Sequence, residues 1–79
     1  MRILDDESDK KLDNVSIFLT KEEAVQLRGY LNQLISNPAL QHSHLSSADY
    51  KKEITVCIYK EDNLSSFDER SKKLILHDK

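Results

Sequence analysis

Two histidines, a glutamate and the only cysteine of the sequence carry the side chains best suited to chemistry. His42 and His44 are two positions apart, so on a strand both imidazoles project from the same face. Glu53 and Cys57 lie in the next predicted strand. Imidazole, carboxylate and thiolate are all zinc ligands, and a histidine beside a cysteine can generate the reactive thiolate. These four residues define a candidate metal site or a candidate thiol-dependent active site.

The register of the two strands decides whether these four residues can meet. If Ser46 is opposite Lys51, then Leu45 and Ile54 share the core face, and the four candidates share the open face. A slip of one residue moves the histidines to the face of Ile54. Cys57 also lies inside a strand, whereas activated cysteines are usually found at helix starts or in loops. We therefore predict solvent-facing histidines, no catalytic residue and no metal or other cofactor, with a small metal- or thiol-dependent enzyme as the alternative.

Residues 14–35 are the segment that we predict to form most of the core, as a strand followed by a helix. Apolar side chains occupy the odd positions from Val15 to Leu19, and Ser16 and Phe18 occupy even ones, which is the alternation of a strand with one buried face. We expect residues 12–19 to form this strand and to pair with a short strand near residues 2–4. A second clear strand is predicted at residues 50–59, in a hairpin that turns at residues 47–50.

Two helices are predicted from their capping signals. Thr20 and Glu23 have the spacing of a capping box, so the first helix begins at Lys21, and the sequence up to Pro38 ends it. A similar pattern at residues 66–69 predicts a second helix that begins after Ser66 and ends at about His77. The first helix has an apolar stripe, which we predict to be its core face: Ala24, Leu27, Leu31, Leu34 and Ile35.

The predicted order is strand, strand, helix, strand, strand, helix. Such ββαββα chains form α+β folds, in which helices cover one side of an antiparallel sheet. With 79 residues, the chain is short enough for a single core. We therefore predict one domain over residues 1–79, with a four-stranded antiparallel sheet and both helices on one face.

Composition limits the classes of function. Charged residues make up 33% of the chain, and 12 basic and 14 acidic residues are interspersed for a net charge of −2. A domain that binds nucleic acid through bulk electrostatics is usually basic. One cysteine cannot form an intramolecular disulfide, and no apolar run has the length of a spanning helix. The sequence predicts a cytoplasmic protein with no membrane partner.

Three segments carry a resemblance. NVSIFLTKEEAVQLRGYLNQL at residues 14–34, EITVCIY at residues 53–59 and SFDERSKKLI at residues 66–75 resemble segments of a group of short uncharacterised bacterial proteins. These segments match strands and capped helices. The resemblance implies a bacterial, cytoplasmic protein and brings no activity, ligand or site residue.

The open face of the predicted sheet is the candidate interaction surface. A solvated sheet face usually carries charges, whereas this one would be partly apolar, which is typical of a protein contact. Its residues are Ser16, Phe18, Thr55, Cys57 and Tyr59. We predict a non-catalytic interaction or regulatory accessory protein, which uses this face or an edge strand to bind another protein or a second copy. Base stacking on Phe18 and Tyr59 is the nucleic-acid alternative, which we do not expect because basic and glycine-rich neighbours are missing.

Overall fold

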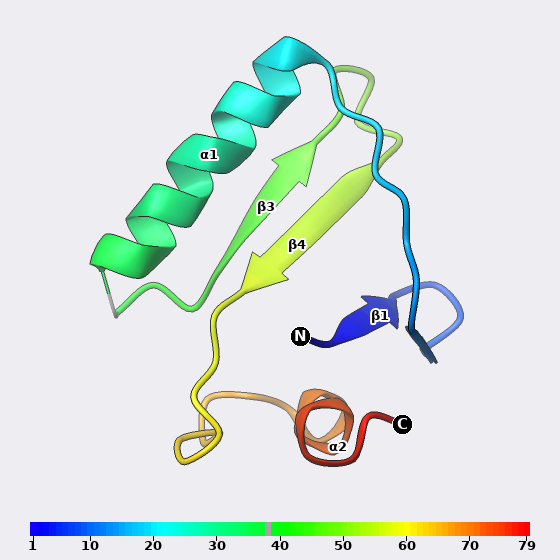
Figure 1. Ribbon diagram of the computed structural model, residues 1–79, viewed down its shortest axis with the longest axis vertical. Helices are drawn as coiled ribbons and strands as arrows, with labels where there is room; N and C mark the ends of the chain where they lie inside the picture. The colour runs from blue at the N-terminus through cyan, green and yellow to red at the C-terminus, as the bar shows by residue number, and fades with distance from the viewer. Residues whose placement is uncertain (38) are drawn as a thin grey trace. The chain divides into compact units, whose positions relative to one another are not determined.

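The computed structural model describes residues 1–37 and 39–79, and within them the chain is a mixed α+β protein with two helices and two two-stranded antiparallel sheets (Figure 1). In chain order the elements are β1 (Ile3–Asp5), β2 (Lys10–Leu12), α1 (Lys21–Ser36), β3 (His42–Ser46), β4 (Glu53–Cys57) and α2 (Glu69–His77). They belong to two compact units, one of residues 18–59 and one that joins residues 1–17 to residues 60–79. We call them the central unit and the terminal unit.

The central unit begins with the capping box of α1. The backbone N–H of Glu23 donates to Thr20 Oγ1 at 3.1 Å, and the Glu23 carboxylate accepts from the Thr20 N–H at 2.9 Å. These two bonds satisfy donors that the first turn of a helix leaves without partners. The helix ends at Ser36, and the N–H of Asn37 donates to the carbonyl of Gln33 at 2.9 Å. The predicted start and end of this helix are confirmed, although Pro38 lies outside the described residues.

The β3–β4 hairpin supplies the other layer of the central unit. Leu45 is opposite Ile54, and Ser43 is opposite Val56. Leu45 and Leu34 of α1 are each only 4% exposed, and α1 packs mainly on β3. This contact between one helix and one strand is the core of the unit.

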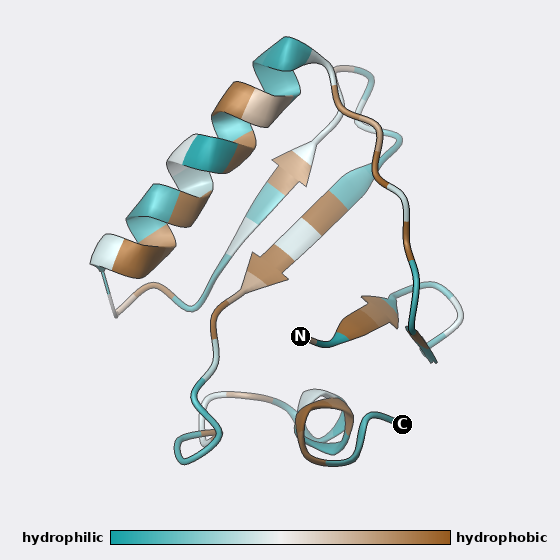
Figure 2. Ribbon diagram, in the orientation of Figure 1, coloured by the Kyte–Doolittle hydropathy of each residue, from teal (hydrophilic) through white to brown (hydrophobic). Residues whose placement is uncertain are grey.

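The buried side of α1 differs from the predicted stripe. Leu27 and Leu34 do face inward, but Tyr30 joins them on the inner side while Ile35 is 71% exposed. A two-stranded hairpin is too narrow to cover an arc of about 100° on a helix. Part of the apolar arc therefore stays in solvent. Figure 2 shows the hydrophobic positions along α1 in brown.

The terminal unit packs α2 with the β1–β2 hairpin. Leu74 and Ile75 of α2 are its buried apolar residues. Arg2, just before β1, donates from Nε to the carbonyls of Leu74 at 3.0 Å and Ile75 at 3.2 Å. The Leu74 carbonyl also accepts from the N–H of Asp78 at 2.9 Å. Carbonyls at the end of a helix lack an N–H partner within it, so Arg2 supplies a donor to this end of α2.

The second helix starts later than predicted. Asp68 is its N-cap, because the Asp68 carboxylate accepts from the N–H of Ser71 at 2.7 Å. The prediction that Ser66 caps the start of this helix is therefore wrong, and α2 begins at Glu69. The expected end at His77 is confirmed.

The strand predicted at residues 12–19 is wrong from residue 13 onward. Residues 14–20 form no strand, and Val15 and Ile17 are both exposed. The strand that pairs with β1 is Lys10–Leu12 instead. The intervening turn is closed by Asp5, whose carboxylate accepts from the N–H groups of Glu7 and Ser8 and whose carbonyl accepts from Asp9. A short loop costs less closure entropy than a long one, so β1 pairs with the nearer segment.

This local pairing removes the predicted four-stranded sheet. The structure has two separate two-stranded sheets, β1–β2 and β3–β4, and the two helices belong to different units. Residues 1–37 and 39–79 therefore contain no single sheet that both helices cover. The assignment of residues 1–79 to one domain stays a prediction. Neither of the described helices has the length and hydropathy to cross a membrane.

Candidate interaction surface

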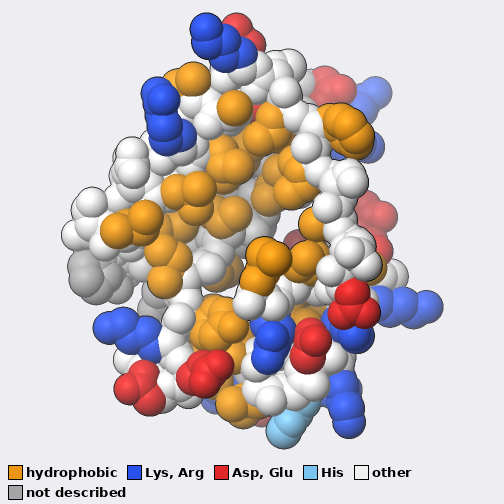
Figure 3. Space-filling model, in the orientation of Figure 1, with side chains coloured by type: hydrophobic (Ala, Val, Ile, Leu, Met, Phe, Trp, Pro, Cys, Tyr) orange, Lys and Arg blue, Asp and Glu red, His pale blue; other side chains and the backbone are white. Residues whose placement is uncertain are grey.

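The central unit leaves much of its apolar surface in solvent. Its buried apolar residues are Leu34 and Leu45. The large apolar side chains of the same unit that are exposed by more than a third are Phe18, Val25, Leu31, Ile35, Leu40, Tyr50 and Ile58. Hydrophobic side chains gather over the α1 side of this unit (Figure 3). Exposed apolar area on this scale in so small a unit is typical of a surface that binds a protein.

Strand β4 forms one outer edge of the small sheet, and β3 forms the other. In the described residues β4 pairs with β3 alone, so its second edge has no strand partner. Ile54 and Val56 project toward the helix side and are half-buried, and Ile58, in the same alternation, is 47% exposed. Because α1 packs mainly on β3, this apolar row is only partly covered. An uncovered edge with apolar side chains is a template for a further strand.

The opposite face of the hairpin holds the four residues with candidate chemistry. His42 is opposite Cys57, and Ser46 is opposite Glu53 rather than the assumed Lys51. A shift by two residues keeps every side chain on its face. His42, His44, Glu53 and Cys57 therefore do share the open face, and all are exposed.

His44 is already engaged on this face. Its Nδ1 lies 2.8 Å from Glu53 Oε1 and 2.8 Å from Thr55 Oγ1. A carboxylate only accepts hydrogen bonds, so this contact requires the tautomer with the proton on Nδ1, in which Nε2 is the nitrogen that can bind a metal. The rings of His42 and His44 meet edge to face, with centroids 4.9 Å apart. Among the described residues, no group of three or more His, Cys, Asp and Glu side chains is arranged to hold a metal ion.

The predicted interaction residues are distributed over different parts of the chain. Thr55 and Cys57 lie on the outer face of β4, and Tyr59 follows the strand and is half-buried. Ser16 and Phe18 lie in the segment that forms no strand, and Phe18 is 92% exposed. These five residues therefore do not form one sheet face. Their role in binding stays a prediction.

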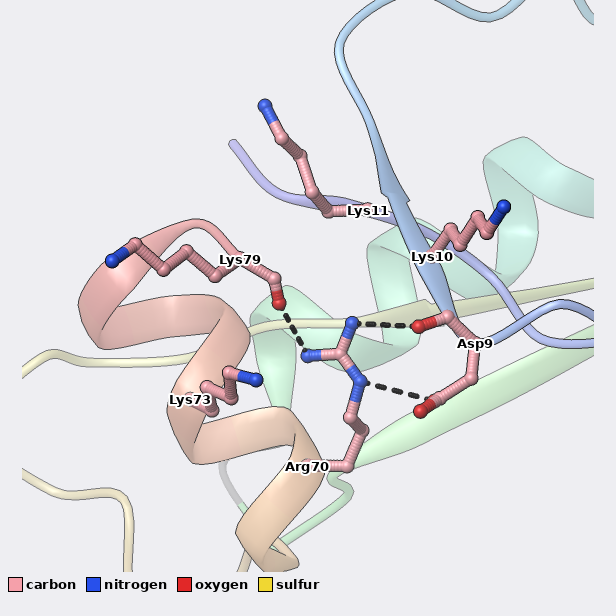
Figure 4. Close-up of a pocket in the computed structure, with 6 residues that line it drawn as sticks. All are labelled: Asp9, Lys10, Lys11, Arg70, Lys73 and Lys79. Carbon is pink, nitrogen blue, oxygen red and sulfur yellow. Dashed lines mark hydrogen bonds and ion pairs between the residues drawn. The ribbon is translucent and has the colours of Figure 1, made fainter.

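A second feature, which the sequence did not suggest, is a basic hollow in the terminal unit. It has a volume of about 360 Å³, and Figure 4 shows the side chains around it. Its lining residues are Asp9, Lys10, Lys11, Arg70, Lys73 and Lys79. They come from β2, α2 and the residues beside them, far apart in sequence. The only signal in the sequence is the i, i+3 spacing of Arg70 and Lys73 on one helix, which is too common to identify a site.

Arg70 is fixed at the centre of this hollow. Its Nε donates to Asp9 Oδ1 at 3.0 Å, and its Nη2 donates to the Asp9 carbonyl at 2.9 Å. Nη1 donates to the carbonyl of Lys79 at 2.8 Å. The guanidinium thus links the β1–β2 turn, α2 and the residues that follow α2 (Figure 4).

Comparisons with known proteins assign no family. No family model, curated protein or solved structure matches this chain. The resemblance to short bacterial proteins therefore gains no support from these comparisons.

Proposed function

We propose that the protein is a non-catalytic interaction module that binds another polypeptide along the open edge of β4. The observation that carries this proposal is the apolar row of Ile54, Val56 and Ile58 beside an edge with no strand partner in the described residues. An added strand supplies backbone hydrogen bonds to such an edge, and its side chains cover the row. The single cysteine of the sequence fits a protein of the reducing cytoplasm.

The polypeptide that fits this edge best is a second copy of the same chain. If two antiparallel copies of β4 pair about a two-fold axis, the apolar row of one copy lies beside the apolar row of the other. With the axis at Val56, this residue is opposite its own copy, and Ile54 is opposite Ile58 of the second copy. With the axis at Thr55, Lys52 would be opposite Ile58, which places a charge against the apolar row. The Val56 register also places Lys52 opposite Lys60 at the ends of the pairing, but it keeps all three apolar residues opposite one another and is the favoured one.

Such a dimer would contain the arrangement that the sequence predicted for one chain. Two β3–β4 hairpins would join into one four-stranded antiparallel sheet, and the two copies of α1 would lie on the same face of it. Leu31 and Ile35 are two of the apolar residues of α1 that one hairpin leaves exposed, and they would then border a wider sheet. Covering exposed apolar surface is the main driving force of association.

Light scattering across a range of protein concentrations tests the proposal. The wild-type chain is expected to have twice the mass of one chain, and Ile58→Lys is expected to be a monomer because it places a charge in the interface. Leu76→Lys is the matched control, since Leu76 is also exposed but belongs to the terminal unit, and it should stay dimeric. A wild-type protein that is monomeric throughout contradicts self-association. A dimer that Ile58→Lys leaves intact contradicts the β4 edge.

A further inference from the structure

The basic hollow of the terminal unit concentrates positive charge in a chain whose net charge is negative. Five of its six lining side chains are cationic, while the whole chain has a net charge of −2. Like charges held around one depression repel one another and attract anions from solution. The charge distribution is therefore that of an anion site.

The few acidic partners nearby leave most of this charge uncompensated. Asp9 pairs with Arg70, and Lys11 pairs with Asp13 at 2.7 Å. Lys10, Lys73 and Lys79 have no ion-pair or hydrogen-bond partner for their ammonium groups among the described residues. Lys73 turns its ammonium group toward Arg70, whereas the side chains of Lys10 and Lys79 extend away from it and must rotate to reach a ligand in the hollow (Figure 4).

Arg70 gives the hollow a positive charge that is held in a fixed position. Three of its five N–H groups are used by Asp9 and Lys79, which leaves one N–H on each terminal nitrogen. A guanidinium held in this way contributes charge and direction at a low entropic cost, whereas the surrounding lysines act as mobile point charges. Oxygens of phosphate groups are the usual partners of this combination.

From these observations we propose that the hollow binds a small multivalent phosphate anion, such as a short polyphosphate chain. Several linked phosphates match several separate cationic side chains better than one phosphate does, and the hollow of about 360 Å³ is open to solvent, so a chain of phosphates can lie along it. This site lies within the terminal unit and does not depend on the β4 edge.

Titration with inorganic tripolyphosphate, followed by amide chemical shifts in NMR spectra, tests this site. Shifts are expected at residues 9–11 and 70–73, and inorganic sulfate at the same ionic strength should bind much more weakly. Lys73→Gln should weaken tripolyphosphate binding about threefold, as for one solvent-exposed ion pair, and the double variant Lys10→Gln/Lys73→Gln should weaken it about tenfold.

The matched control is Lys72→Gln. Lys72 is the neighbour of Lys73 on α2, but it pairs with Glu69 at 3.4 Å and does not line the hollow. Its replacement should leave binding unchanged. Equal losses for Lys72→Gln and Lys73→Gln, or shifts spread evenly over the surface, would mean unspecific charge attraction and would overturn the proposal. No binding of tripolyphosphate by the wild-type protein would overturn it as well.

Discussion

The buried core of this protein is small, so hydrogen bonds from individual side chains should contribute a large share of its stability. The buried apolar residues are Leu34, Leu45, Leu74 and Ile75. Polar side chains close the helix ends and the turns. Removing one of them exposes or leaves unpaired the backbone groups that it satisfies. Small changes at these positions should therefore be visible in stability measurements.

Thr20 offers the cleanest case. Thr20→Ala removes the hydroxyl that accepts from the Glu23 N–H, and it should lower the free energy of unfolding by about 1 kcal/mol. Thr20→Ser keeps the hydroxyl and should retain most of the stability. Urea unfolding followed by circular dichroism measures both variants. An alanine variant as stable as the wild type would mean that the capping box contributes nothing.

Carboxylates in the turns and at the start of α2 predict how stability depends on pH. Hydrogen bonds from Ser8 lower the pKa of Asp5, those from Ser47 lower the pKa of Asp49, and those from Ser71 lower the pKa of Asp68, each from an ordinary value of 3.8. A carboxyl with a lowered pKa in the folded state stabilises it above the unfolded pKa, and this contribution is lost as pH falls through the folded pKa. The loss should therefore begin near the ordinary value of 3.8 and continue below it.

Urea midpoints measured from about pH 6 down to about pH 2 test this dependence. The midpoint should stay nearly constant until about pH 4 and then fall. Asp49→Asn should be less stable at neutral pH and should lose less on acidification, because one of the titrating groups is gone. If Asp49→Asn has the same acid dependence as the wild type, Asp49 is not one of the groups responsible.

At the scale of elements, the β3–β4 hairpin carries local strain that can be removed. Tyr50 has a φ of 59° in the turn, a left-handed conformation that is unfavourable for residues with a Cβ. Its side chain is 85% exposed, so little packing is lost when it is replaced. The turn is held by other groups, among them the Ser47 hydroxyl, which donates to Asp49 at 2.6 Å and accepts from the Lys52 N–H.

Tyr50→Gly should therefore raise the free energy of unfolding, by up to about 1 kcal/mol. Thermal unfolding gives the comparison, with Tyr50→Ala as the control that removes the ring but keeps the Cβ. The alanine variant should be close to the wild type. A glycine variant that is less stable than the alanine variant would show that the φ of Tyr50 is not a source of strain.

Helices and strands that depend on local signals are the parts of the fold that the sequence can predict. The Thr20 capping box and the β3–β4 hairpin depend on neighbours in sequence. The capping box is confirmed, and the hairpin forms, but β4 spans Glu53–Cys57 rather than residues 50–59 and its register differs by two residues from the assumed one. The strand predicted through Val15 failed because alternation identifies a segment that suits a sheet but not the strand it pairs with. Lys10–Leu12 lies closer to β1 and takes that place. The basic hollow was missed for a related reason, since Arg70 and Lys10 meet only after folding.

At the scale of the whole molecule, association should be part of folding stability. The central unit buries little apolar surface of its own, whereas small domains need a sufficient core, a disulfide, a metal or a partner. One cysteine cannot form an intramolecular disulfide. Binding to the folded state alone raises stability with the concentration of the binding partner, by about 2.7 kcal/mol at a hundredfold excess over the dissociation constant.

If a second copy covers the β4 edge, the midpoint of thermal unfolding must rise with protein concentration. We expect a steady increase for the wild type over a hundredfold range, because dilution separates the copies before they unfold. Ile58→Lys should have a lower midpoint that no longer depends on concentration, whereas Leu76→Lys should follow the wild type. Scanning calorimetry at several concentrations measures these values. A wild-type midpoint that stays constant across the range would mean that each chain folds alone, with its apolar row in solvent.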